Sequence, residues 1–113
     1  MKTVISNPKE LSFADYMALT MDEDALPLRT AIGSELALKQ YIITTEERED
    51  VTVQILGISD GEKVYRTTSK SFIKSFTDLI DIAAEIGQEI HHIKVCSGTS
   101  KRGRTFMTCK LID

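Results

Sequence analysis

Residues 51–68, VTVQILGISDGEKVYRTT, decide the fold of this chain of 113 residues. Val51, Val53 and Ile55 alternate with polar residues, as in a β-strand that buries one face. The Asp-Gly pair at 60–61 favours a tight hairpin turn, because such turns need backbone conformations with positive φ. The segment after the turn returns as a second strand. The sequence therefore predicts a β-hairpin.

Strand signals lie on both sides of this hairpin. Residues 36–45 end in Tyr, two Ile and two Thr, which favour strands, and the polar residues 46–50 are expected to connect them to the hairpin. Residues 90–96 and 105–112 are also strand-like. The connector between them, residues 97–104, holds two glycines and three cations. A second hairpin is expected here.

One helix is expected between the two hairpins. Ser75 is its expected N-cap and Gly87 its expected end. Residues 69–74 form either an extra turn of this helix or a loop. The apolar residues recur at spacings of three and four and share one face: Phe76, Leu79, Ile80, Ala83 and Ile86.

The first 35 residues differ in character from the rest. Apolar residues are scattered among acids, and residues 22–24 are all acidic. A short helix is expected at 13–19, with Ser12 as its cap. We interpret residues 1–35 as an N-terminal arm that packs loosely or belongs to an interface, and residues 36–113 as the main domain.

Composition is that of one ordinary globular domain, with 42% hydrophobic and 27% charged residues. No apolar run is long enough to span a membrane, and the N-terminus lacks the apolar stretch of a signal peptide. We expect a cytoplasmic protein, in the host cytoplasm if the gene is viral. Cys96 and Cys109 are then expected to be thiols.

Charge is divided unevenly along the chain. Residues 1–60 carry five Lys/Arg and eleven Asp/Glu, a net charge of −6. Residues 61–113 carry nine Lys/Arg and six Asp/Glu, a net charge of +3. An acidic protein can still present a basic face that attracts a polyanion.

The predicted order of elements is strand, strand, strand, helix, strand, strand. This is the order of an OB-fold, a five-stranded barrel with its helix between the third and fourth strands. An α+β sheet with one packed helix is the alternative. With its basic, glycine-flanked loop at 98–104, the chain resembles, over residues 36–112, the small single-stranded DNA-binding proteins of phages and conjugative elements.

This resemblance implies a ligand that lies across the second and third strands and beside the last hairpin loop. On this sequence it implies contacts from Tyr65, Arg66, Lys101, Arg102 and Arg104. Single-strand binding combines cations along the backbone path with aromatic faces for stacking. That requirement adds Lys63, Lys70 and Phe106. Tyr65 is alternatively a packing residue, and the loop is alternatively a solvated hairpin tip.

No catalytic residues, cofactor or metal site are expected. The chain has no phosphate-binding loop, nucleophile elbow or H-E-x-x-H motif. His91 and His92 are adjacent on a strand and point to opposite faces, so they cannot easily hold one ion. If the last hairpin is symmetric about residues 102–103, Cys96 and Cys109 lie opposite each other.

The leading functional hypothesis is a non-enzymatic single-stranded DNA-binding protein that acts in replication or transfer of a phage or mobile element. Its partner is single-stranded nucleic acid, with the choice between DNA and RNA left open, and its N-terminal arm is a candidate for self-association. The alternative is a protein-binding module, such as a small phage-type inhibitor that uses the acidic residues 22–24 and 46–50.

Overall fold

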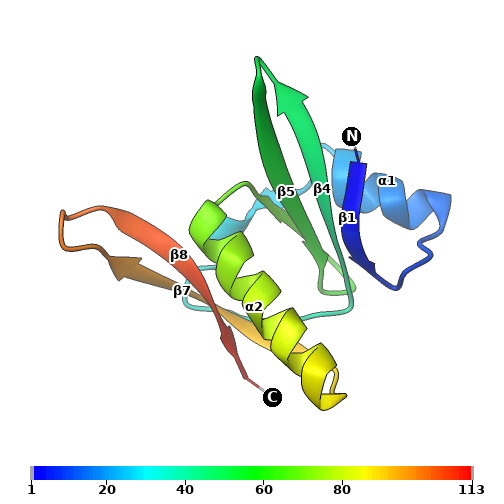
Figure 1. Cartoon of the computed structure of the whole chain (residues 1–113). Coiled ribbons are helices and arrows are strands. Elements are labelled where there is room, and N and C mark those ends of the chain that lie inside the picture. The colour runs from blue at the N-terminus through cyan, green and yellow to red at the C-terminus, as the bar shows by residue number, and fades with distance from the viewer. Residues whose placement is uncertain (1, 113) are drawn as a thin grey trace.

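The computed structural model describes residues 2–112 of the chain. Its strands form a five-stranded sheet of order β1-β4-β5-β6-β2 and a three-stranded sheet of order β3-β7-β8. The β4–β5 and β7–β8 hairpins project from the body in different directions (Figure 1). The elements are β1 (Lys2–Asn7), α1 (Phe13–Met21), β2 (Leu26–Pro27), the 3-10 helix η1 (Leu28–Ala31), β3 (Glu35–Ala37), β4 (Gln40–Arg48), β5 (Val51–Ser59), β6 (Val64–Thr67), α2 (Lys70–Ile86), β7 (His92–Thr99) and β8 (Thr105–Leu111).

The hairpin predicted at residues 51–68 is confirmed as β5 and β6, which pair antiparallel. Its turn is held by Asp60, whose Oδ1 accepts the backbone N–H groups of Glu62 and Lys63 at 2.8 and 2.7 Å. Gly61 has a φ of 100°, a conformation that L side chains rarely adopt. The Asp-Gly signal therefore corresponds to a real turn.

The β4–β5 hairpin is longer than the sequence predicts. Residues 46–50 are expected as a connection, but strand pairing continues as far as Arg48↔Val51. Only Glu49 and Asp50 turn the chain, with φ values of 42° and 68°. Positive φ at both central residues is the geometry of a two-residue hairpin turn. The acidic residues of 46–50 therefore lie on the paired strands and at the tip of a projecting hairpin.

The core lies between α2 and the inner face of the β4–β5 sheet. Leu56, Ile58, Phe72 and Phe76 are at most 1% exposed and belong to one buried cluster. The rings of Tyr41 and Phe76 meet edge to face with their centroids 5.1 Å apart, a favourable arrangement for aromatic pairs. Burial of these large side chains against one sheet face stabilises the fold.

The helix α2 begins earlier than the predicted start at Ser75. The hydroxyl of Ser69 accepts the backbone N–H of Phe72 at 3.3 Å and caps the helix, so residues 70–74 form its first turns. Ser75 lies inside the helix, and its Oγ accepts the backbone N–H of Cys109 at 2.8 Å. The predicted end is confirmed, because Gly87 takes the left-handed conformation with a φ of 70°.

The second hairpin is confirmed as β7 and β8, and its strands extend to the pair Thr99↔Thr105. This register is centred on Arg102. Cys96 therefore pairs with Thr108 rather than with Cys109, and the expected opposition of the two cysteines is wrong by one residue. Adjacent positions on paired strands point to opposite faces. Cys109 is buried, Cys96 is partly exposed, and both are free thiols.

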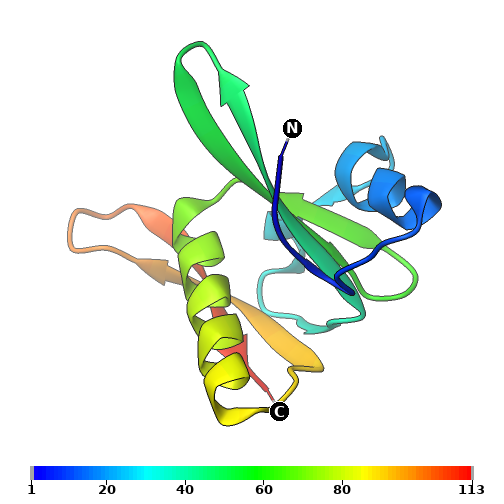
Figure 2. The same ribbon diagram turned by 45° about the vertical axis from the view of Figure 1, so that its right-hand side comes forward.

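Within residues 2–35, two strands pair with the five-stranded sheet and one helix contacts it. The predicted short helix is confirmed as α1, capped by Ser12, whose Oγ accepts the N–H of Asp15 at 3.1 Å. Strand β1 pairs antiparallel with β4, and β2 pairs parallel with β6. The helices α1 (blue) and α2 (yellow-green) lie on opposite sides of the central sheet (Figure 2).

The described strands do not close into a barrel, and two contacts explain why. The outer edge of β6 is occupied by β2. The outer edge of β8 is covered by α2, where Ser71 donates to the carbonyl of Met107 at 2.8 Å and Ser75 accepts from Cys109. Both edges are thus satisfied by other elements. The predicted mixed, mostly β class is confirmed, with α2 packed on an open pair of sheets.

Candidate nucleic-acid interface

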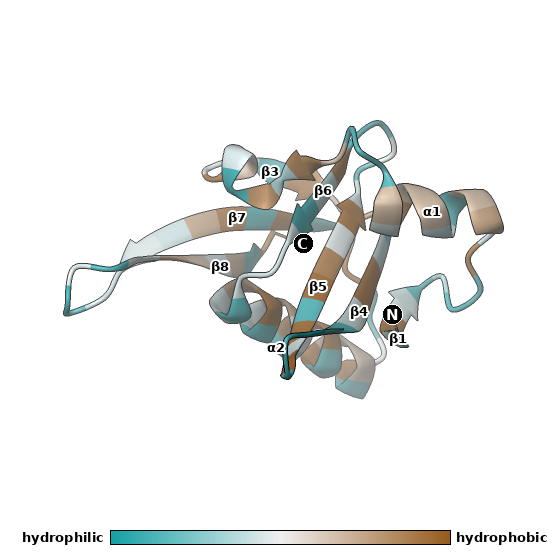
Figure 3. Cartoon of the chain, turned by 90° about the horizontal axis from the view of Figure 1, so that it is seen from above, coloured by the Kyte–Doolittle hydropathy of each residue, from teal (hydrophilic) through white to brown (hydrophobic). Residues whose placement is uncertain are grey.

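The tip of the β7–β8 hairpin carries three of the predicted contact residues. Lys101, Arg102 and Arg104 are all exposed, and within residues 2–112 none of them forms an ion pair. The tip projects from the body as a hydrophilic end of the hairpin (Figure 3). Three unneutralised cations on a projecting loop make a strong local positive potential despite the acidic chain.

This loop is compact. The backbone N–H of Ser100 donates to the carbonyl of Arg104 at 2.8 Å, and the N–H of Gly103 donates back to the carbonyl of Ser100 at 2.9 Å. The hydroxyl of Ser100 also accepts the N–H of Arg104 at 3.1 Å. Gly103 has a φ of 79°. Short local hydrogen bonds therefore hold the three cations together on one loop.

Phe106 lies just behind the loop, on the outer face of the hairpin. Its ring packs over Gly98, its partner on β7; a Cβ at position 98 would lie only 2.7 Å from the ring Cζ. The side chain is 38% exposed. The missing side chain at Gly98 leaves room for the far end of the ring, and part of the ring is open to solvent. An exposed ring beside cations suits base stacking.

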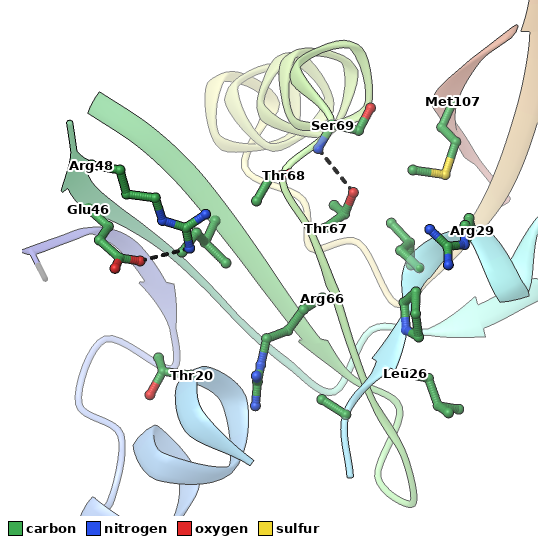
Figure 4. A pocket seen from close by; sticks show the side chains of 14 residues that line it. Thr20, Leu26, Arg29, Glu46, Arg48, Arg66, Thr67, Thr68, Ser69 and Met107 are labelled. Atoms are coloured by element: carbon green, nitrogen blue, oxygen red, sulfur yellow. Dashed lines mark hydrogen bonds and ion pairs between the residues drawn. The ribbon is translucent and has the colours of Figure 1, made fainter. Parts of the chain in front are cut away.

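A groove of about 630 Å³ lies beside the hairpin, between β4, β6, the β2–η1 segment and β8. Arg29, Arg48 and Arg66 line it from three different elements, and Met107 of β8 forms one wall (Figure 4). The residues 67–69 add hydroxyl groups where β6 leads into α2. The groove therefore offers charged and neutral hydrogen-bond donors on a partly apolar floor.

Two of these arginines already have partners. Arg48 forms an ion pair with Glu46 at 3.0 Å, and their side chains are 54% and 38% exposed. Arg66 donates through its guanidinium to the backbone carbonyls of Leu19 and Asp22. Partial burial lowers the pKa of Arg66, and the carboxylate of Asp22 opposes that change. The group stays charged at neutral pH, because arginine is not deprotonated in proteins.

The remaining predicted contact residues lie in three different places. Tyr65 is 8% exposed and belongs to the core cluster, because it pairs with Ile58 and shares the buried face of the sheet. Lys63 is exposed at the β5–β6 turn. Lys70 lies at the start of α2, on the other side of the β4–β5 hairpin from Arg66. The structure thus brings together the hairpin residues but not all eight.

A second groove, of about 680 Å³, lies between α2 and the β1–β4–β5 side of the sheet. Val4, Ile5 and Ile73 give it an apolar lining, and Lys70 and Lys74 stand on its helical wall. Lys74 is paired with Asp78 at 3.1 Å. This groove is more apolar than the first one, and two cations line it where three line the first, so it is less suited to a polyanionic strand.

The sequence alone did not identify Arg29, Arg48 or Met107 as site residues. Arg48 lies among the acidic residues of 46–50, so the local net charge is negative and does not indicate a cationic site. The turn at residues 49–50 extends the hairpin and places Arg48 on the wall of the groove. Arg29 belongs to a segment that looked separate from the main domain. The spacing of apolar residues along the helices and strands does not predict that Arg29 or Arg48 lies in the groove.

Two further properties of the described residues bear on the class of protein. No helix within residues 2–112 has the length and apolar character needed to cross a membrane. In the same range, His, Cys, Asp and Glu side chains nowhere gather in threes as a metal ion would need.

A projecting basic hairpin with an exposed ring, next to a groove lined by arginines, has features that nucleic-acid-binding surfaces share. The family model for phage single-stranded DNA-binding proteins matches residues 30–112, which is well over half of the chain. The chain belongs to this family, and its partner is single-stranded DNA. Comparison with curated proteins gave no match, and neither did comparison with solved structures. Of the two functions predicted from the sequence, the leading one is confirmed.

Proposed function

We propose that the protein coats single-stranded DNA during replication of a phage genome, and that the strand runs across the outer face of the β4–β6 sheet to the β7–β8 hairpin. The observation that carries this proposal is the exposed triad of Lys101, Arg102 and Arg104 next to the open ring of Phe106. Arg29, Arg48 and Arg66 continue the positive path along the groove.

The energetics of such a surface are those of sequence-independent binding. Base stacking on an aromatic side chain contributes about 1–3 kcal/mol per base and accepts any base. Phosphate neutralisation releases counterions, and for single strands the slope of log K against log salt is about −0.7 per contact. Binding should therefore weaken as salt rises, and it should show little sequence preference.

We propose that the fold is related to the OB-fold by its connections, although its barrel is open. The stretch made of β3 and β4 pairs with β7 through its first part and with β5 through its second part. A first strand shared between two sheets, followed by β5, β6, a helix and a last hairpin, is the OB order. On that relation, the ligand face is the outer face of β5 and β6.

Several further properties belong to the same proposal. We expect no catalytic activity, no cofactor and a location in the host cytoplasm. Residues 36–113 act as the DNA-binding unit, which the family match from residue 30 onward supports. Residues 1–35 act as an arm, and a role of this arm in self-association is part of the proposal. DNA is the expected ligand in preference to RNA.

The test is fluorescence anisotropy with labelled oligo-dT at about 50 and 200 mM salt. The variant Lys101→Glu/Arg102→Glu/Arg104→Glu should lose most of the binding at the higher salt, and its salt slope should be shallower by about 2. The matched control Lys2→Glu/Lys9→Glu/Lys39→Glu changes the net charge by the same amount at exposed sites away from the hairpin.

Retained affinity in the hairpin variant, or an equal loss in the control, would show that the hairpin is not the contact surface. Unlabelled oligo-rU and duplex DNA serve as competitors in the same assay. Oligo-rU that competes as well as oligo-dT would contradict the expected preference for DNA.

A further inference from the structure

The helix α1 lies on the face of the sheet that we assign to DNA. Ile42 pairs with Gly57, and Gly57 pairs with Arg66, so these three residues share the outer face of β4, β5 and β6. Gly57 is the point of closest approach, since a Cβ there would lie 2.4 Å from the backbone oxygen of Leu19. The α1 helix thus covers the part of this face next to the groove.

Eight of the nine residues of α1 are half-buried or exposed. Leu19 is the one buried residue among the nine of α1. Leu19 and Ile42 are each 1% exposed, but neither belongs to the main core cluster. A hydrogen bond between two side chains, from Gln40 Nε2 to Asp15 Oδ2 at 3.0 Å, adds to this contact. Segments with few buried apolar contacts are those that open locally at low free-energy cost.

Arg66 forms hydrogen bonds with the C-terminal end of α1. Its guanidinium donates to the carbonyls of Leu19 and Asp22, which are at the negative end of the helix dipole. Residues 10–28 contain five acidic residues and no Lys or Arg. An acidic segment therefore rests on the proposed DNA face and uses a cation that the groove offers to a phosphate.

We propose that residues 13–25 form an autoinhibitory cover, which single-stranded DNA displaces by taking Arg66 from the end of α1. This inference rests on the proposed path of the strand. Hydrogen bonds from a guanidinium to a phosphate are stronger than those to a neutral carbonyl, so a bound strand competes well for Arg66. Release of the cover opens Ile42 and Gly57 on the sheet to the bases.

A cover of this kind reduces the measured affinity for DNA. The apparent dissociation constant equals the intrinsic value divided by the fraction of molecules whose face is open. A change that loosens α1 without touching a charge should therefore tighten binding. A change that loosens a true contact element would weaken binding instead, so the sign of the effect separates the two roles.

The variant Gly57→Ala provides this change in the full chain. The three atoms nearest to its added Cβ all belong to Leu19, with the carbonyl oxygen at 2.4 Å, so α1 and the strand must separate at this point. Leu19→Ala loosens the same contact from the other side. Gln54→Ala, an exposed position on the same strand, is the matched control.

Two measurements decide the matter: oligo-dT affinity by anisotropy, and hydrogen exchange of the amides in α1 with and without oligo-dT. We expect both loosening variants to bind at least about threefold more tightly, the control to be unchanged, and the wild-type α1 amides to exchange faster when DNA is bound. Unchanged or weaker binding in both variants, or slower exchange in α1, would overturn the cover. Absence of protection at residues 100–106 would instead count against the proposed DNA path.

Discussion

Phe106 and Tyr65 show how strand parity separates a surface ring from a core ring. Both aromatic residues lie on strands beside basic residues, and the sequence predicts both as contacts. Tyr65 pairs with Ile58 on the buried face, whereas Phe106 pairs with Gly98 on the outer face of the other sheet. Residue type could not distinguish them, because a one-residue change in register exchanges the two faces.

Cys109 is the residue whose chemistry responds most clearly to burial. Desolvation, with a smaller contribution from Cys96, raises the pKa of its thiol from 9.0 to about 12. The unfolded chain loses this proton near pH 9 and the folded chain keeps it to about pH 12. Stability from this group is therefore complete below pH 9 and falls as the pH rises between these values.

Cys109→Ala removes this pH dependence. We expect the stability difference between wild type and variant, measured by urea unfolding, to shrink by about 2 kcal/mol between pH 8 and pH 10.5. Lysine and tyrosine titrations are common to both proteins and cancel in the difference. Parallel pH curves for the two proteins would show that the thiol titrates alike in the folded and unfolded states.

At the scale of elements, α2 was predicted with the right end and the wrong start. The helical apolar pattern is clear from Phe76 onward, and Ser69, Ser71 and Ser75 are all acceptable caps by residue type. The choice depends on tertiary contacts, because Ser71 and Ser75 bind the edge of β8. That edge is brought to the helix by a hairpin more than 30 residues later in the chain, so a local pattern could not reveal it.

Ser75→Ala tests the docking of α2 on this edge. The substitution leaves the N–H of Cys109 without its acceptor, and an unsatisfied buried donor costs about 1–3 kcal/mol. We expect the free energy of unfolding to fall by about 1–2 kcal/mol in urea denaturation, after the gain in helix propensity from alanine. Thr77→Ala, half-buried on the same helix, should change stability less. Equal effects would mean that Ser75 contributes no special contact.

At the scale of the whole molecule, the order of the elements from β4 to β8 was predictable. The strands β1 and β2, the division of residues 36–45 between β3 and β4, and the closure of the sheets were not. Hydrophobic alternation and turn residues located the strands β5 to β8. The open barrel follows from β2 on the edge of β6 and from two serines on the edge of β8. A two-residue parallel pairing and two hydroxyl contacts leave no periodic signal in the sequence.

The same scale contains the central claim, which is the path of the strand across the outer sheet face to the β7–β8 hairpin. The most direct measurement is photocrosslinking of oligo-dT that carries iododeoxyuridine, followed by mass spectrometry of the crosslinked peptides. We predict crosslinks to Phe106 and to peptides of the groove around Arg66. Crosslinks confined to the α2 side of the sheet, around Lys70 and Lys74, with none at Phe106, would contradict the account.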